Sequence, residues 1–287
     1  MENLPNLTKP VQSLYKKILI ILSFPIILEE YFSPSCGKDY KQTFLSKLIL
    51  LLKFYRNTRS IPSGTNFLEH IIMAAKIMNI PKNKQGNIIE CGAYKGASTA
   101  NISLIAKITN RTLEVFDSFQ GLPEPANIDK KHILIDNRQI HTYQKGAWYS
   151  TLNEVKKNIK KYGAIESVNF NPGYFDKTLP NFKRPSVFIF LDVDLKSSLE
   201  TCLKYLWPNL KNNSYLFCHE SQHSEIASLF YDQYWWSKYL RSKAPGLVGA
   251  GNGLGLFPQS GGAGSPLGYT VKNPNIKKYK IEKQIGT

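Results

Sequence analysis

Cysteine is scarce in this chain, and the few cysteines present form no recognisable arrangement. The 287 residues include 4 cysteines, Cys36, Cys91, Cys202 and Cys218, with no C-x-x-C pair among them. Small secreted domains depend on closely spaced cysteines for disulfides, and structural zinc sites need ligand pairs at short spacing. The sequence therefore indicates reduced thiols in a cytoplasmic protein, and it predicts neither a disulfide framework nor a zinc site.

Long hydrophobic runs are also missing. The stretch KKILIILSFPIIL at residues 16–28 resembles a signal-peptide core, but Pro25 interrupts it and the following EEYF offers no A-x-A cleavage site. A membrane-spanning helix needs ~20 apolar residues, so we expect this stretch not to cross a bilayer. A second apolar and basic run, FLSKLILLLKFYR, occupies residues 44–56. Residues 1–60 are predicted to form amphipathic helices that either cap the core or make peripheral contact with a membrane.

Acidic residues are few relative to basic ones. There are 37 Lys and Arg against 21 Asp and Glu, a formal net charge of +16. Residues 1–60 carry 9 basic and 4 acidic side chains, and residues 238–287 carry 8 and 1. Such flanks either favour an anionic partner or form a solvated surface. Because the chain has no base-methylation motif and no interleaved aromatic and basic residues, we expect no nucleic-acid partner.

From residue 62 onward, strand and helix patterns alternate regularly. Apolar residues at helical spacing predict helices over 65–80, 97–108, 155–163 and 199–210, the first capped by Ser63 or Thr65. Apolar and β-branched runs predict seven strands, at 86–91, 112–117, 167–175, 187–194, 214–220, 253–257 and 267–271. The alternation predicts an α/β domain over residues 61–287, with a Rossmann-like, doubly wound, mostly parallel sheet and a Gly-rich loop region at 246–270.

Polar residues stand at or just past the carboxyl ends of these strands. They are Glu90, Asp117, Gly173, Asp192 with Asp194, and His219 with Glu220. Ligands of open α/β sheets bind beyond the carboxyl ends of the strands. We therefore expect these residues to form one site.

The first strand end leads into the turn ECGAYKGAST at residues 90–99. Gly92 and Gly96 would let the backbone approach a ligand closely. The spacing E-x-G-x-x-x-G disfavours a dinucleotide-binding turn, which needs G-x-G-x-x-G, and a P-loop, which needs G-K-[ST]. Asp117, at the next strand end, is placed to accept hydrogen bonds from ribose hydroxyls. The turn is either an adenosyl-binding loop or simply a tight connection.

The segment FDSFQGLPEP at residues 116–125 resembles the F-D-S-F-E-G-L-P signature of the macrocin O-methyltransferase (TylF-like) family. Members are class I S-adenosylmethionine-dependent enzymes that methylate sugar hydroxyls. Further segments resemble the family in the same order, at residues 145–163, 168–180 and 190–210, and the similarity covers roughly residues 60–236. The resemblance implies the class I methyltransferase fold and S-adenosylmethionine as cofactor.

The resemblance also implies individual roles for cofactor-binding residues. Glu90, Gly92, Gly96 and Ser98 would surround the methionine part of the cofactor, and Asp192 would lie beside it. Asp117 would hold the ribose, Ser118 and Phe119 would line the adenosyl pocket, and Tyr174 after Gly173 would lie near the adenine.

In the D-x-D segment, the resemblance implies that Asp192 is a magnesium ligand and Asp194 the general base. A divalent cation and a nearby carboxylate make a sugar hydroxyl a better nucleophile. Where the family usually carries a second pair of aspartates, this chain has His219 and Glu220. Glu220 can supply an oxygen ligand. For His219 three roles are open: it is a ligand that suits manganese, iron or zinc better than magnesium, it is a base, or it is only hydrogen-bonded. We expect Asp192, His219 and Glu220 to form the metal site.

The acceptor side is less clearly marked. His141 either contacts substrate as a second catalytic residue or is solvated, and Tyr143, Trp148 and Tyr149 either stack on a sugar ring or pack in a lid. Trp235 and Trp236 are expected to be buried on a helix. The leading hypothesis is an O-methyltransferase for a sugar hydroxyl of a small molecule or glycan, with a homo-oligomer as one option. The alternatives are a D-x-D glycosyltransferase and a catalytically silent adenosyl-binding protein.

Overall fold

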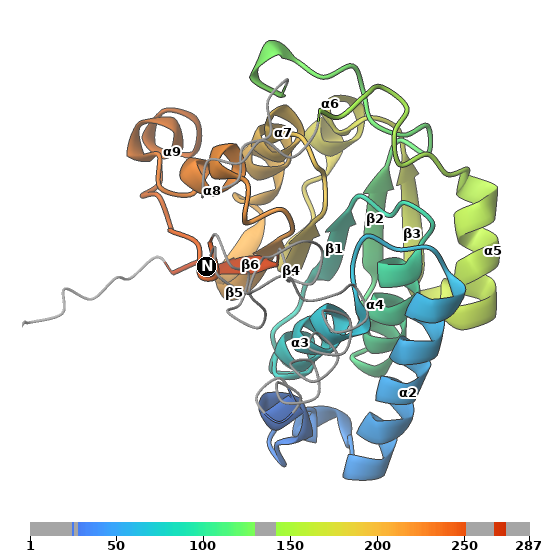
Figure 1. The fold of residues 1–287 in the computed structure, drawn as a ribbon. Coiled ribbons are helices and arrows are strands. Elements are labelled where there is room, and N and C mark those ends of the chain that lie inside the picture. The colour runs from blue at the N-terminus through green and yellow to red at the C-terminus, as the bar shows by residue number, and fades with distance from the viewer. Residues whose placement is uncertain (1–24, 26–27, 130–141, 251–266, 274–287) are drawn as a thin grey trace, which may run out of the picture.

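The computed structural model describes residue 25 and residues 28–129, 142–250 and 267–273, in which helices cover both faces of one sheet (Figure 1). The strands are β1 (Asn87–Cys91), β2 (Leu113–Asp117), β3 (Val168–Pro172), β4 (Ser186–Leu191), β5 (Leu210–Cys218) and β6 (Gly268–Val271). The α-helices are α2 (Phe44–Ser60), α3 (Phe67–Met78), α4 (Ala97–Ile108), α5 (Leu152–Tyr162), α6 (Phe175–Thr178), α7 (Lys196–Leu206), α8 (Ser224–Leu229) and α9 (Gln233–Leu240). Short 3₁₀ turns at Lys38–Tyr40, Asn127–Asp129, Ile165–Ser167 and Leu179–Asn181 complete the elements.

The described sheet has six strands in the order β3-β2-β1-β4-β5-β6. Strands β1 to β5 are parallel, and β6 runs antiparallel to β5. The chain order reverses between β1 and β4, which is where ligands bind in doubly wound sheets. The expected Rossmann-like, mostly parallel sheet is confirmed. The seventh expected strand, at residues 253–257, lies outside the described residues.

Two hydrophobic cores flank the sheet. One lies under α2, α3, α4 and α5, and the other under α6, α7, α8 and α9. Strand β4 separates them and is buried at every position, as its continuous apolar run predicts for a central parallel strand. Trp235 and Trp236 are buried on α9, which confirms the expectation for this pair.

Helix α2 is fixed to the first of these layers by one side. Its buried residues, Lys47, Leu50, Phe54 and Asn57, recur at helical spacing. The Asn57 Nδ2 atom donates to Asn101 Oδ1 on α4 at 2.8 Å, and the ammonium of Lys47 donates to the Ser33 carbonyl at 2.7 Å. The helix therefore packs on the core as a cap would. The domain boundary expected at residue 60 stays a prediction.

The cap of α3 differs from the expectation of Ser63 or Thr65. The Oδ1 atom of Asn66 accepts from the backbone N–H groups of Leu68 (2.9 Å) and Glu69 (3.1 Å), and Glu69 Oε2 accepts from the Asn66 N–H at 2.8 Å. This reciprocal arrangement is a capping box, and an amide oxygen caps a helix as well as a hydroxyl does. Thr65 instead hydrogen-bonds to His70.

Candidate active site

A cavity of about 720 Å³ opens at the carboxyl edge of the sheet. It is lined by residues that follow β1, β2, β4 and β5, including Gly92, Asp117, Asp192 and His219. The size is that of small-molecule sites, which commonly measure about 300–1,000 Å³. Most of the polar residues expected from separate strand ends therefore meet around one cavity, namely Asp117, Asp192, Asp194, His219 and Glu220.

Gly92 allows the turn after β1 to pack against the end of β4, where no larger residue fits. Gly92 has a φ of 87°, and a Cβ atom built on it would lie 1.8 Å from the carbonyl oxygen of Asp192. The Asp192 N–H donates to the Cys91 carbonyl at 2.9 Å and continues the pairing of the two strands. Gly96, with a φ of 85°, is the residue preceding α4. Both glycines let the turn pack closely, because a Cβ on Gly92 would meet the end of β4 and a Cβ on Gly96 would meet Val155 of α5.

Glu90 lies beneath this turn rather than in the cavity. Its side chain is fully buried, and its Oε1 atom accepts a hydrogen bond from Ser98 Oγ at 2.5 Å. Burial raises the pKa of Glu90 from 4.5 to about 8, against the opposing effect of the Ser98 hydroxyl. The carboxyl is therefore protonated at neutral pH and ties the end of β1 to the first turn of α4.

Asp117, at the end of the neighbouring strand β2, organises the backbone beside this turn. Its Oδ2 atom accepts from the N–H groups of Ala93 (2.7 Å) and Tyr94 (3.3 Å), and its Oδ1 atom accepts from the Phe119 N–H at 2.7 Å. Burial raises the pKa of Asp117, although these backbone donors act in the opposite direction. The carboxyl thus joins the β1 turn to the loop after β2. Ser118 Oγ donates to the Gly121 carbonyl at 2.7 Å within that loop.

The residues expected to bind a cofactor fall into two groups. Gly92, Asp117, Ser118, Tyr174 and Asp192 line the cavity. Glu90, Gly96, Ser98, Phe119 and Gly173 are not among the lining residues and lie behind it. Phe119 is buried and its ring packs against Phe170, with the centroids 6.2 Å apart. The second group therefore shapes the wall of the cavity from behind.

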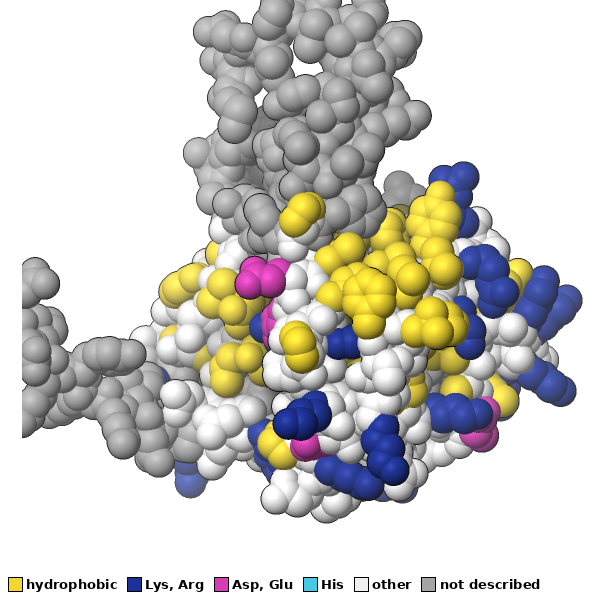
Figure 2. Space-filling model, turned by 90° about the horizontal axis from the view of Figure 1, so that it is seen from below, with side chains coloured by type: hydrophobic (Ala, Val, Ile, Leu, Met, Phe, Trp, Pro, Cys, Tyr) yellow, Lys and Arg dark blue, Asp and Glu magenta, His cyan; other side chains and the backbone are white. Residues whose placement is uncertain are grey.

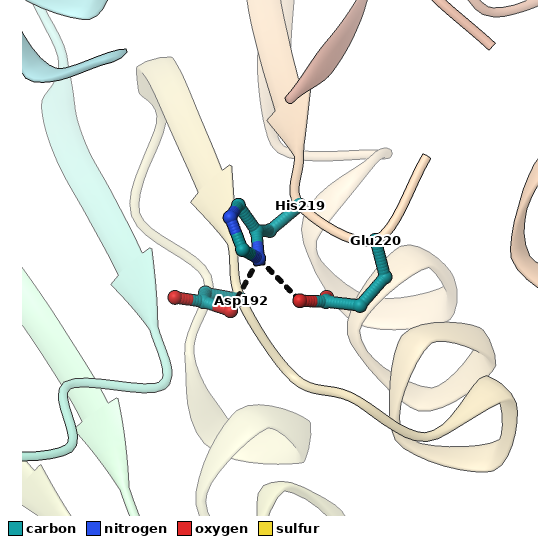
Figure 3. Close-up of side chains that lie close together, drawn as sticks. All are labelled: Asp192, His219 and Glu220. Atoms are coloured by element: carbon teal, nitrogen blue, oxygen red, sulfur yellow. Dashed lines mark hydrogen bonds and ion pairs between the residues drawn. The ribbon is translucent and has the colours of Figure 1, made fainter. Parts of the chain in front are cut away.

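Asp192, His219 and Glu220 converge where β4 and β5 end. Figure 3 shows the three side chains pointing toward one another, with His219 Nδ1 between the two carboxylates. This nitrogen lies 3.3 Å from Asp192 Oδ1 and in close contact with Glu220 Oε1. Burial alone would lower the pKa of His219, but the charges of Glu220 and Asp192 outweigh it and raise the pKa well above its usual value. The imidazole is thus protonated between the carboxylates.

This cluster fits a divalent cation. One ligand atom from each of the three side chains lies within 4.8 Å of the other two, and the set combines two carboxylates with an imidazole. Carboxylates bind magnesium and manganese, and imidazole favours manganese, iron or zinc.

Asp194 stands next to this cluster in a strained conformation. Its φ is 58°, and the Leu195 N–H donates across it to the Val193 carbonyl at 2.5 Å. Burial raises the pKa of Asp194 well above its ordinary value, and the negative charges of Glu220 and Asp192 add to this effect. The hydroxyl of Tyr143 hydrogen-bonds to the Asp194 carboxyl. Asp194 is half-buried at the cavity wall, and in its ionised form a carboxylate with a raised pKa is a stronger base than an ordinary one.

Tyr143 and Glu69 were not expected to support the acidic cluster. Tyr143 reaches Asp194 from a segment without regular structure, and the sequence predicts for it only stacking on a sugar or packing in a lid. Glu69 Oε1 faces His219 Nε2 at 4.0 Å, and this nitrogen has no hydrogen-bond partner among the described residues. The signal for Glu69 was present in the sequence as the N-x-x-E capping pattern, which places a carboxylate at the start of α3.

Loops over the cavity are tied together by backbone hydrogen bonds. Leu122 donates to the Ala147 carbonyl and Gly146 donates to the Leu122 carbonyl, each at 2.9 Å. Trp148 packs edge-on against Tyr94, and its side chain is about half exposed. These contacts place Trp148 beside the cavity, and both roles expected for it, stacking on a sugar or packing in a lid, stay predictions. His141 lies outside the described residues.

Comparisons with known proteins agree with this geometry. The model of the macrocin-O-methyltransferase (TylF) family matches residues 64–242. The chain is 30% identical over 152 residues to the mycinamicin III 3''-O-methyltransferase of Micromonospora griseorubida and 27% identical over 158 residues to the demethyldecarbamoylnovobiocin O-methyltransferase of Streptomyces niveus. These matches cover 50% and 53% of this chain and 57% and 59% of the relatives, so the chain spans less than two thirds of either.

A solved structure shares the fold. The O-methyltransferase NovP superimposes with a TM-score of 0.55 at 18% sequence identity, over 91% of this chain and 99% of that protein. The family match includes the turn after β1, the loop after β2 and the cluster at the ends of β4 and β5. The chain therefore belongs to the macrocin-O-methyltransferase (TylF) family.

Proposed function

We propose that this protein is an S-adenosylmethionine-dependent O-methyltransferase that methylates a hydroxyl of a sugar or glycosylated small molecule, or of a glycan. The observation that carries the proposal is the convergence of Asp192, Asp194, His219 and Glu220 on one cavity with the Gly92 turn and Asp117. One wall thus suits an adenosyl ligand, and the other wall holds carboxylates suited to activating a hydroxyl. The two curated relatives, both named O-methyltransferases, support this reading.

The cofactor would lie along the ends of β1, β2 and β3. Asp117 is placed to accept hydrogen bonds from the ribose hydroxyls, Ser118 and Phe119 to shape the adenosyl pocket, and Tyr174 to lie near the adenine. Gly92 leaves space for the methionine part, while Glu90, Gly96 and Ser98 hold that turn in position. S-adenosylmethionine, when bound, supplies the electrophilic methyl group.

Asp194 would act as the general base. It takes the proton of the acceptor hydroxyl onto a carboxylate oxygen while the hydroxyl oxygen forms its bond to the methyl carbon and the bond from that carbon to sulfur breaks. Tyr143 positions the base by donating a hydrogen bond to it. A divalent cation, when held by Asp192, His219 and Glu220, supplies positive charge that favours the ionised hydroxyl. His219 and Glu220 are each about 6% exposed, so little water reaches these two members of the cluster.

The remaining wall of the cavity suits a hydroxylated acceptor. Gln222 and Ser197 line it, and the Oε1 atom of Gln222 is buried without a hydrogen-bond partner among the described residues. A buried amide oxygen without a partner loses free energy that a ligand hydroxyl can restore. Asp129 fixes Ser197 by accepting from its hydroxyl at 2.6 Å. Sugar hydroxyls match this polar wall better than an apolar acceptor would.

The glycosyltransferase alternative has less support. It explains the D-x-D segment but gives no role to the Gly92 turn or to the loop after β2, and the chain belongs to a methyltransferase family. A catalytically silent adenosyl-binding protein is motivated by the replacement of an aspartate pair with His219 and Glu220. Turnover with an acceptor distinguishes that alternative from an enzyme.

Calorimetric titration with S-adenosylhomocysteine, with and without manganese or magnesium, tests the cofactor assignment. We expect micromolar binding that Asp117→Ala weakens by about tenfold or more, because a hydrogen bond to a charged group contributes roughly 1.5–3 kcal/mol. Glu166→Ala, which removes an exposed carboxylate bonded to Lys107, is the matched control and should bind as the wild type does. Metal-dependent binding of UDP-sugars without binding of S-adenosylhomocysteine would support the glycosyltransferase.

A further inference from the structure

Helix α2 carries a second apolar face on the side that does not pack. Opposite the buried residues, Leu45, Ile49 and Leu52 are 64%, 47% and 58% exposed, with Phe44 and Tyr55 beside them at 64% and 47%. Seen from below, hydrophobic side chains gather in one patch with Lys and Arg side chains along its edge (Figure 2). We call these five residues the α2 face. Contiguous exposed apolar surface of this kind marks an interaction site.

The positive charge beside the α2 face has no compensating acid among the described residues. Five exposed cations border it, namely Lys53, Arg56 and Arg59 on α2 and Lys160 and Lys161 on α5. Arg56 and Lys161 approach the same ring, that of Tyr162, at 5.7 and 4.8 Å. Helix α2 contains no Asp or Glu, and none of the five cations forms an ion pair with a described residue. The border therefore presents uncompensated positive charge.

We propose that the α2 face docks on an anionic membrane surface. Its aliphatic and aromatic side chains would enter the headgroup region while the flanking cations bind lipid phosphates, as in peripheral amphipathic helices. A second copy of the chain fits less well, because a symmetric contact would bring these cations against one another without an acid between them. The proposal does not depend on the methyltransferase activity.

The mode of contact is peripheral. No helix in the described part of the chain is long and apolar enough to cross a bilayer. The inner side of α2 is held by Lys47 and Asn57, so the outer side can bind without the helix leaving the core. The helix lies in the layer of α3 to α5, and α7 to α9 lie across the sheet from it (Figure 1).

Vesicle co-sedimentation of the full-length protein tests the proposal. The vesicles contain phosphatidylcholine with or without phosphatidylglycerol, and the variants are Leu45→Ser/Ile49→Ser/Leu52→Ser and Lys53→Gln/Arg56→Gln/Arg59→Gln. The matched control, Lys238→Gln/Arg241→Gln/Lys243→Gln, removes three exposed cations on and after α9 in the other helical layer. Circular dichroism and the thermal midpoint confirm that each variant is folded.

We expect the wild type to bind only the vesicles with phosphatidylglycerol, and less at high salt. Binding should fall about fivefold for each α2 cation removed and about tenfold or more in the apolar variant, while the control binds as the wild type does. Absence of wild-type binding, or equal binding by the apolar variant, overturns the proposal. So does light scattering that shows a dimer dissociated by the apolar variant, because the α2 face would then contact a second copy.

Discussion

Replacing Glu90 with glutamine tests whether a protonated carboxyl supports the cofactor turn. In the folded protein the pKa of Glu90 is about 8 because of burial, whereas in the unfolded chain it is close to 4.5. Between these values the folded state keeps a proton that the unfolded chain has lost. The stability contributed by the protonated carboxyl is therefore complete below pH 4.5 and is lost as the pH rises through about 8.

The size of this loss follows from the two pKa values. Each pKa unit corresponds to about 1.4 kcal/mol, so the free energy of unfolding loses on the order of 5 kcal/mol across the window. A glutamine does not titrate, and its amide oxygen can still accept the hydrogen bond from Ser98. The free energy of unfolding of Glu90→Gln, relative to that of the wild type, should therefore increase with pH.

Urea unfolding of the ligand-free protein at several pH values between 4.5 and 8 measures this difference. Glu166→Gln serves as the control, because the hydrogen bond from Lys107 lowers the pKa of that exposed carboxyl. The control should gain no relative stability as the pH rises. Parallel curves for Glu90→Gln and the wild type would refute the assignment of a buried, protonated carboxyl beneath the turn.

Three further predictions concern the cavity. Gly92→Ala should abolish S-adenosylhomocysteine binding and lower the thermal midpoint more than Gly146→Ala does. Both glycines have a positive φ, which costs an alanine roughly 1–2 kcal/mol, but only at Gly92 does the added Cβ collide with the backbone. Equal effects of the two substitutions would contradict the close-packed turn. Asp194→Asn should lower turnover by about 10²–10⁴-fold in a methyl-transfer assay and leave S-adenosylhomocysteine affinity unchanged, so full activity would exclude Asp194 as the base. Glu69→Gln keeps the helix cap but removes the negative charge that faces His219. Calorimetry should therefore show manganese affinity reduced about tenfold. Unchanged affinity would argue against a role of Glu69 in supporting His219.

The sheet and the strand-end residues could be predicted from sequence because both follow from short-range patterns. The apolar run before Asp192 predicts a central strand, and parallel strands bring their carboxyl ends to one edge. That rule was sufficient to predict the meeting of Asp192, His219 and Glu220, whose strands are neighbours in the sheet. It does not distinguish side chains that face a cavity from those behind it, such as Glu90 and Phe119.

Contacts made from outside the sheet could not be predicted in the same way. Tyr143 reaches Asp194 from an irregular segment, and no periodicity relates the two positions. Glu69 is the third residue of α3 because Asn66 caps the helix, whereas a cap at Ser63 or Thr65 would give Glu69 no reciprocal partner. The contact of Glu69 with His219 joins the start of α3 to the residue after β5, and no local spacing rule relates positions that far apart in the chain.

The charge of the cluster gives a reason for the unusual histidine. Asp192, Asp194 and Glu220 place three carboxylates around His219, and the repulsion between them contributes to the raised pKa of Asp194. With a protonated His219 and no cation, three carboxyl groups share one positive charge, and the pKa values of Asp194 and Glu220 are raised. With a divalent cation and a neutral His219, one negative charge remains, and it is cancelled when Asp194 accepts the proton of the acceptor hydroxyl. A neutral imidazole thus lets the site hold a cation without the fourth carboxylate that a second aspartate would add. Proton transfer to Asp194 then leaves the cluster without net charge, and a site with little water favours this neutral state because an uncompensated charge there is poorly solvated.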